Sequence, residues 1–198
     1  MRVPRGTSRY EYTVKRSRFI GQAWAVADRR EVERIVADLR CEHRDAHHVA
    51  YAFFIGDAHS QLVGLSDDGE PHGTAGRPIF DILKGSDITD CLVTVLRFFG
   101  GTKLGTGGLV HAYGDAARGC LGVLTTEPKR DLRAAFVTCP YQLLTVVRTI
   151  LQDVRAEITA EAFKETVTVE FLLERGLEER LSAALKDVSR GTLSPCFT

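Results

Sequence analysis

The alternation of apolar and polar residues along the first two thirds of the chain predicts a mixture of short strands and helices. Alternating or continuous apolar runs predict strands at residues 10–16, 18–26, 49–55, 61–65 and 92–99. Apolar residues at helical spacing predict one helix at about residues 30–41 and another at about residues 108–120. Between them a short helix is expected, with Thr74 as its cap and Pro78 in its first turn.

A polar segment around Pro128 separates this part from a C-terminal part with a pattern of its own. There the apolar positions predict strands at residues 132–138, 155–163 and 166–173, a last short strand within 193–197, and helices at 141–153 and 177–188. The resulting order, βαββαβ, is the split βαβ pattern of a ferredoxin-like sandwich. We therefore predict an α+β fold of two domains, residues 1–127 and residues 128–198.

The composition is that of a globular protein without a dominant charge. The chain has 198 residues, of which 44% are hydrophobic and 26% are charged, and its 26 Lys and Arg balance its 26 Asp and Glu. These values exclude a disordered tail, and the zero net charge excludes a basic field over the whole chain. The first 20 residues are the exception, with six basic groups and one acidic group. These basic side chains either contact phosphates or, as the simpler interpretation, are solvated strand-edge charges that discourage aggregation.

Hydropathy and cysteine usage indicate a cytoplasmic protein that does not enter a membrane. No apolar run approaches the ~18 residues that a membrane helix needs, and the N-terminus lacks the apolar segment of a signal peptide. The five cysteines lie far apart and form no C-x-x-C pair, so neither structural zinc nor a disulfide framework is expected. This cysteine usage is typical of a reducing compartment.

The strongest candidate for chemistry is a glycine-dense loop between a predicted strand and a predicted helix. Eight of the 18 glycines lie between residues 100 and 122. Glycines let the backbone approach a ligand closely, and a helix N-terminus adds partial positive charge, so a phosphate or a carboxylate is the natural ligand. The candidate anion- or nucleic-acid-binding residues are Arg97, Gly100, Gly101, Lys103, Gly105, Gly107 and Gly108, with Thr74 and Arg77 from the preceding segment. The alternative is a tight loop whose glycines only turn and pack, because the spacing matches neither a Walker A nor a dinucleotide-binding motif.

An acidic cluster precedes this loop in the sequence. Asp67, Asp68 and Glu70 carry three carboxylates within four residues, which is a possible Mg²⁺ site beside a substrate phosphate. We favour the simpler interpretation, an Asp-Gly turn whose acids are solvated or hold basic side chains of a neighbouring loop. His48 is a possible polar site residue, which we expect to be buried with a hydrogen-bond partner rather than bound to a metal. No catalytic nucleophile stands out, and no cofactor or metal is predicted.

Four literal strings give the sequence a resemblance to a known family. In chain order they are KRSRFIG, HRDAHHVAYAFFIG, SDDGEPHGTAGRPI and LRFFGGTKLGTGGLVHAYGDA, and together they resemble the IMPACT/YigZ family of small cytoplasmic proteins over roughly residues 9–122. The resemblance implies a first domain with the fold shared by a small-subunit ribosomal protein, a domain of elongation factor G and the GHMP kinases. It implies a second domain like the ferredoxin-fold domains of elongation factor G. Two departures are His111, where the family often has Arg, and His72, where a small residue is common.

The resemblance also carries an expected function, because the family is associated with translational control. It implies a non-enzymatic protein that binds RNA, the ribosome or translation factors, and that contributes to translational regulation. The alternative hypothesis is a protein that binds a phosphorylated ligand, or a Mg-dependent enzyme that uses the glycine loop and the acidic cluster at residues 67–70.

Overall fold

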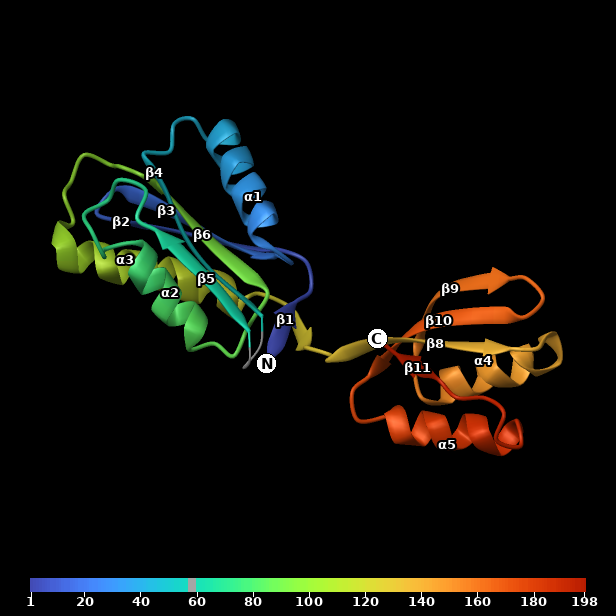
Figure 1. The fold of residues 1–198 in the computed structure, drawn as a ribbon. Coiled ribbons are helices and arrows are strands. Elements are labelled where there is room, and N and C mark those ends of the chain that lie inside the picture. Colours follow the sequence, from blue (N-terminus) through green and yellow to red (C-terminus); the bar gives the residue numbers. More distant parts are fainter. Residues whose placement is uncertain (57–59) are drawn as a thin grey trace. The chain divides into compact units, whose positions relative to one another are not determined.

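The structure, a computed structural model, describes residues 1–56 and 60–198 of the chain. These residues form helices and strands in two compact units, Met1–Lys129 and Arg130–Thr198 (Figure 1). The α+β fold with two domains that the sequence predicts is thereby confirmed.

The first unit is built on a five-stranded antiparallel sheet in the order β2-β3-β6-β4-β5. Its strands are β2 (Ser8–Val14), β3 (Ser17–Ala25), β4 (His48–Gly56), β5 (Gln61–Ser66) and β6 (Cys91–Phe98). Helix α1 lies on one face of this sheet, and helices α2 and α3 lie together on the other face (Figure 1). The three helices span Arg29–Glu42, Gly76–Lys84 and Gly105–Gly122.

The central strand β6 is buried along almost its whole length because helices cover both faces of the sheet. Val93 and Val95 belong to the apolar cluster that includes residues of α2 and α3, whereas Leu92 and Leu96 belong to the cluster that includes residues of α1. Successive side chains of a strand point to opposite faces, so one strand contributes to both cores. A continuous apolar run in the sequence is the pattern expected of such a strand.

A short two-stranded ribbon joins the ends of the first unit. Strand β1 (Arg2–Pro4) pairs antiparallel with β7 (Thr126–Pro128). The apolar pattern does not predict this ribbon, because strands of three residues are too short to show a period.

The start of helix α2 differs from the prediction. Thr74 does not cap the helix, because its hydroxyl donates to the backbone carbonyl of Pro71 at 2.7 Å. The helix begins at Gly76, and the carboxylate of Asp67 accepts from the backbone N–H groups of Ala75 at 3.0 Å and of Gly76 at 2.8 Å. A residue nine positions earlier in the sequence therefore satisfies the donors that a local cap would bind.

Helix α3 also begins earlier than predicted, at Gly105 rather than at about residue 108. Three of its first four residues are glycines, which are poor helix formers and hide the helical pattern in the sequence. The glycine loop is consequently shorter than expected, and most of its second half is the first turn of a helix.

The second unit has the order βαββαβ that the sequence predicts. Its elements are β8 (Leu132–Cys139), a 3₁₀ turn (Tyr141–Leu143), α4 (Leu144–Asp153), β9 (Glu157–Phe163), β10 (Val167–Glu174), α5 (Glu178–Val188) and β11 (Cys196–Phe197). The sheet has the order β11-β8-β10-β9 with antiparallel neighbours, and both helices pack on one face of it (Figure 1). This is the strand order of a ferredoxin-like sandwich, as predicted.

Candidate functional site

A pocket of about 480 Å³ lies where the glycine loop leads from β6 into α3. We call it the loop pocket. Its walls come from the start of β4, the segment before α2, the end of β6, and the first turns of α3. The lining residues are His47, His48, Glu70, Pro71, Arg97, Phe99, Lys103, Leu104, Gly105, Thr106 and Leu109. The volume falls in the range of about 300–1,000 Å³ that is typical of small-ligand sites.

The first turns of α3 form one wall of the loop pocket. Gly105 has a φ of 76°, in the left-handed region that glycine adopts without strain. The residue before the helix, Leu104, provides no side-chain hydrogen bond to the helix start. Gly105 and Thr106, which line the pocket, are exposed, and the first N–H groups of a helix have no partner within the helix. These donors and the helix dipole make the wall suited to an anion.

Arg97 and Glu70 form a buried ion pair at the inner end of the pocket. The Nη1 atom of Arg97 donates to Oε1 of Glu70 at 2.6 Å, and the hydroxyl of Tyr113 donates to the same oxygen at 2.8 Å. Arg97 is 6% exposed and Glu70 is 8% exposed. Burial raises the pKa of Tyr113, and the negative charge of Glu70 raises it further, so the hydroxyl remains a donor. One nitrogen of the guanidinium, Nε of Arg97, is buried without a hydrogen-bond partner in the described part of the chain.

Two adjacent histidines complete this end of the pocket. His48 is half-buried; its Nδ1 lies 2.7 Å from the carbonyl oxygen of Asp68, and its Nε2 lies 3.8 Å from Oε1 of Glu70. The backbone N–H of Phe99 donates to Nδ1 of His47 at 3.3 Å. The structure therefore places His48 against a hydrogen-bond partner, and it places both rings on the wall of one pocket.

The three acids of the 67–70 cluster are separated, and each is bonded to groups of the protein. Asp67 accepts three backbone N–H groups, from Gly73 at 2.8 Å and from the two residues at the start of α2. Asp68 accepts from the backbone of Val49 at 2.6 Å and forms an ion pair with Arg40. Among the residues that the structure describes, no group of three or more acids, histidines and cysteines is arranged to hold a metal ion.

The bonds to Asp67 lead to a prediction about acid stability. Burial acts to raise the pKa of Asp67, but the backbone N–H groups of Gly73, Gly76 and Ala75 hold it below the ordinary value of 3.8. A carboxylate with a depressed pKa stabilises the fold at pH values above its unfolded pKa, and this contribution is lost as the pH falls through the folded value. We expect Asp67→Asn to lower the urea midpoint at about pH 6, and we expect the difference from wild type to shrink towards about pH 3. A difference in urea midpoint that stays constant with pH would contradict this interpretation of Asp67. The control is Asp81→Asn, which replaces an exposed carboxylate.

The remaining predicted site residues do not line the pocket. Arg77 is exposed and pairs with Asp81 at 2.9 Å, and Thr74 is buried against Pro71. A Cβ atom built on Gly100 would lie 1.9 Å from the carbonyl oxygen of Arg16, so this glycine permits close packing of two backbones.

Three more predicted glycines have different surroundings. Gly101 has a φ of 84°, which favours glycine in the turn. Gly107 is exposed in the first turn of α3, and Gly108 packs on the side chain of Leu104. Of the predicted residues, the structure brings Arg97, Lys103 and Gly105 together in the pocket with Glu70 and His48.

Sequence reasoning missed two aromatic residues at the site. Tyr113 is fully buried on α3 and donates a hydrogen bond to Glu70, and its helical spacing from Leu109 is the pattern of an ordinary core residue. Phe99 is 40% exposed on the pocket wall, with its ring 5.5 Å from the guanidinium carbon of Arg97. The sequence places Phe99 at the end of an apolar strand, which predicts burial. No pattern around it in the sequence therefore indicates that its ring is exposed at a pocket.

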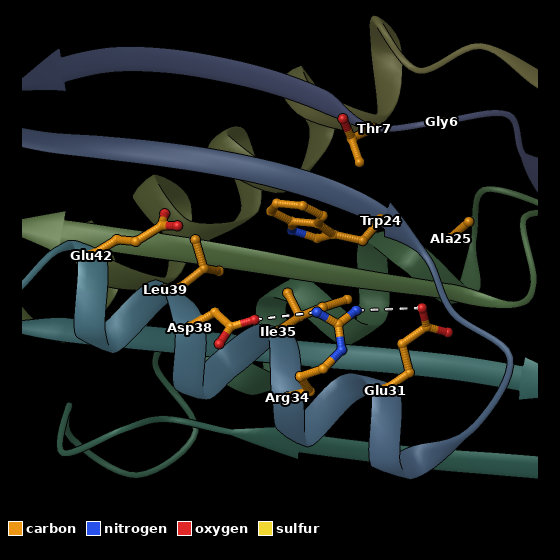
Figure 2. Close-up of a pocket in the computed structure, with 10 residues that line it drawn as sticks. All are labelled: Gly6, Thr7, Trp24, Ala25, Glu31, Arg34, Ile35, Asp38, Leu39 and Glu42. Atoms are coloured by element: carbon orange, nitrogen blue, oxygen red, sulfur yellow. Dashed lines mark hydrogen bonds and ion pairs between the residues drawn. The ribbon is translucent and has the colours of Figure 1, made fainter.

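A second pocket, of about 330 Å³, lies beside helix α1 and has the opposite charge (Figure 2). Trp24 and the helix residues form its walls, and Arg34 lies between Glu31 at 3.7 Å and Asp38 at 3.2 Å. Glu42 adds a third carboxylate. Because this pocket has three carboxylates and one guanidinium, its net charge is negative and disfavours a phosphate. The loop pocket is therefore the better candidate for an anion.

No helix in the described part of the chain combines the length and the apolar character that a membrane span requires.

The fold and the pocket together define a class of protein: two α+β units, the first with a pocket at a helix N-terminus that is lined by a lysine, a buried arginine and an exposed aromatic ring. Comparison with known proteins identifies the family of the chain. The Impact N-terminal domain family matches residues 15–121, and a domain of unknown function (DUF1949) matches residues 137–192. The chain belongs to the IMPACT family.

Relatives of known sequence or structure extend this similarity over nearly the whole chain. IMPACT family member YigZ of Escherichia coli is 37% identical over 91% of this chain and 89% of its own. An IMPACT family member of Haemophilus influenzae is 32% identical over 96% of this chain and 93% of its own. A crystal structure described as that of a hypothetical protein is 34% identical, covers 98% of this chain and 95% of its own, and has a TM-score of 0.75. The family that the sequence resembles is therefore confirmed.

Proposed function

We propose that this protein is a non-enzymatic RNA-binding protein that holds a phosphate of a single strand in the loop pocket. The observation that carries the proposal is the exposed first turn of α3 at Gly105 and Thr106, which lines the pocket together with Lys103 and the buried Arg97. Helix N-termini and lysines are recurrent phosphate-binding groups.

The aromatic wall favours RNA over a simple phosphate ion. Phe99 is 40% exposed beside the donors, and His47 lies edge-on to it with ring centroids 6.2 Å apart. Single-stranded RNA is recognised by stacking of bases on aromatic side chains, with the backbone held by cations and N–H donors. The pocket therefore offers groups for both the base and the phosphate of a nucleotide. Because the family is associated with translational control, the first partners to test are ribosomal RNA, the ribosome and translation factors. On this proposal the protein acts in the cytoplasm.

The alternative of a Mg-dependent enzyme has less support from the geometry. The carboxylates of Asp67, Asp68 and Glu70 already accept hydrogen bonds from the protein and point to different partners. A small phosphorylated ligand remains the alternative occupant of the pocket, and nucleotides belong in the same binding experiment.

The proposal predicts that Lys103→Ala weakens binding of a single-stranded RNA oligonucleotide by roughly three- to tenfold, because one phosphate contact is lost. A fluorescence anisotropy titration over a series of salt concentrations measures this change. The slope of log affinity against log salt should decrease in magnitude by about 0.7, the value for one phosphate on a single strand.

The matched control is Lys84→Ala, which removes an exposed lysine at the end of α2. It should bind RNA as the wild type does. Wild-type protein that fails to bind RNA even at low salt would overturn the proposal, and so would equal binding by wild type and the Lys103 variant. A nucleotide that binds where RNA does not would favour the alternative occupant.

A further inference from the structure

The turn between β2 and β3 holds two long basic residues in the left-handed region of backbone conformation. Val14 pairs with Ser17, which leaves Lys15 and Arg16 as a two-residue hairpin loop. Their φ angles are 46° and 66°. Positive φ at both central residues defines a type I′ turn, which natural hairpins usually build from Asn-Gly, Asp-Gly or Gly-Gly. Lysine and arginine are strained in this conformation, because their Cβ atoms crowd the backbone.

Packing in the first unit explains the backbone of this turn but not its side chains. The carbonyl of Arg16 lies where a side chain on Gly100 would be, so the backbone of the turn is pressed against the glycine loop. Both side chains are exposed, and neither forms a hydrogen bond or an ion pair with a residue that the structure describes. The same backbone contact could be made by Asn-Gly with less strain.

The position of the turn connects it to the start of α3. Lys15 lines a small hollow of about 160 Å³ together with Leu104 and Gly108, next to the first turn of the helix. Asp115 also lines this hollow and is already paired with Arg118 at 2.5 Å.

A third cation follows directly in β3. Arg18 lies over the ring of Phe98 at 4.1 Å, and its distance to the carboxylate of Glu11 is 3.7 Å. Glu11 also binds Arg9 at 2.7 Å, so this single acid is shared between two arginines. The hairpin therefore presents an excess of positive charge beside the glycine loop.

We infer that Lys15 and Arg16 form a second contact for the phosphate backbone of an RNA strand that occupies the loop pocket. This inference rests on the proposed function. Strained backbone positions cluster at functional sites, and exposed basic side chains are among the groups that bind backbone phosphates. The hairpin tip would hold the strand one or more nucleotides away from the nucleotide in the pocket.

The test is the double variant Lys15→Asn with Arg16→Gly, which gives the turn its preferred sequence and removes both charges. We expect the melting temperature to rise by roughly 2–8 °C, because the strain is relieved. We expect the affinity for a single-stranded RNA oligonucleotide to fall by about tenfold, with a salt slope that is smaller by about 1.4. A gain in stability together with a loss of binding would distinguish a functional contact from damage to the fold.

A second variant separates charge from strain. Lys15→Gln with Arg16→Gln removes the charges and keeps non-glycine residues at both positions, so the affinity should fall as much while the melting temperature stays near that of the wild type. Arg29→Gln with Arg30→Gln, on helix α1 at the other face of the sheet, is the charge control and should bind RNA normally.

The outcomes separate this inference from the proposed function. If Lys103→Ala weakens binding and both hairpin variants bind as the wild type does, the inference is wrong and the pocket proposal stands. If the hairpin variants weaken binding and Lys103→Ala does not, the phosphate contact is at the hairpin and the pocket proposal is wrong. Absence of RNA binding by the wild type would overturn both, and an Asn-Gly variant that melts no higher than the wild type would overturn the argument from strain.

Discussion

Glu70→Ala is expected to destabilise the first unit by about 3–5 kcal/mol, the usual cost of removing one partner from a buried ion pair. The carboxylate is almost fully buried and accepts from both Arg97 and Tyr113. Without it, the guanidinium is left as an uncompensated charge in the interior, and the tyrosine hydroxyl loses its acceptor. Urea unfolding followed by circular dichroism measures the change as a lower midpoint.

Two comparisons make this result specific. Glu33→Ala removes an exposed carboxylate that pairs with Arg29 at 3.0 Å, and it should change the free energy of unfolding by less than about 1 kcal/mol. Replacing both buried partners, Glu70→Leu with Arg97→Met, should recover much of the loss, because no charge is then left unpaired. A Glu70→Ala variant as stable as the Glu33→Ala variant would show that the pair is not buried as described.

Gly100→Ala is the second substitution with a large expected effect. The added Cβ would lie 1.9 Å from the carbonyl oxygen of Arg16 and 2.1 Å from its carbonyl carbon, so the backbone of the β2–β3 turn must move away. Overpacking of this kind costs about 1–3 kcal/mol, and the displaced turn should also reduce RNA affinity. Thermal unfolding and the anisotropy titration measure the two effects on the same protein.

The control for this substitution lies a few residues further along the same segment. A Cβ on Gly107 would meet nothing within 4 Å, and the residue lies in a helix, where alanine is preferred to glycine. Gly107→Ala should therefore leave stability unchanged or slightly higher. Equal effects of the two substitutions would show that the close approach at Gly100 is unimportant.

The apolar pattern was sufficient to predict most of the architecture. β6 is a continuous apolar run because both of its faces are covered, and α1 shows its buried stripe of Val32, Ile35, Val36 and Leu39 at helical spacing. These elements are specified by residues close together in the sequence. The ribbon of β1 and β7 was not predictable, because it pairs residues more than a hundred positions apart with little side-chain pattern.

The site was predictable only in part, for reasons that differ among its residues. The glycine loop identified the position of the helix N-terminus, but the partner of Arg97 is Glu70, 27 residues earlier, and no local pattern indicates that pairing. Asp67 and Asp68 likewise bind backbone groups that lie far from them in the sequence. The sequence alone does not distinguish such a structural role of the two carboxylates from a metal site. The strain at Lys15 and Arg16 depends on backbone angles, which the sequence does not show.

Phosphate binding at the start of α3 can be followed through the backbone amide NMR signals of the full chain while a short single-stranded RNA is added. We expect the signals of Gly105 and Thr106 to shift the most, because their N–H groups lie at the pocket wall and bind a phosphate, and we expect a higher salt concentration to reverse the shifts. If saturating RNA leaves these two signals in place, whether it binds elsewhere or does not bind at all, the start of α3 does not bind a phosphate of RNA.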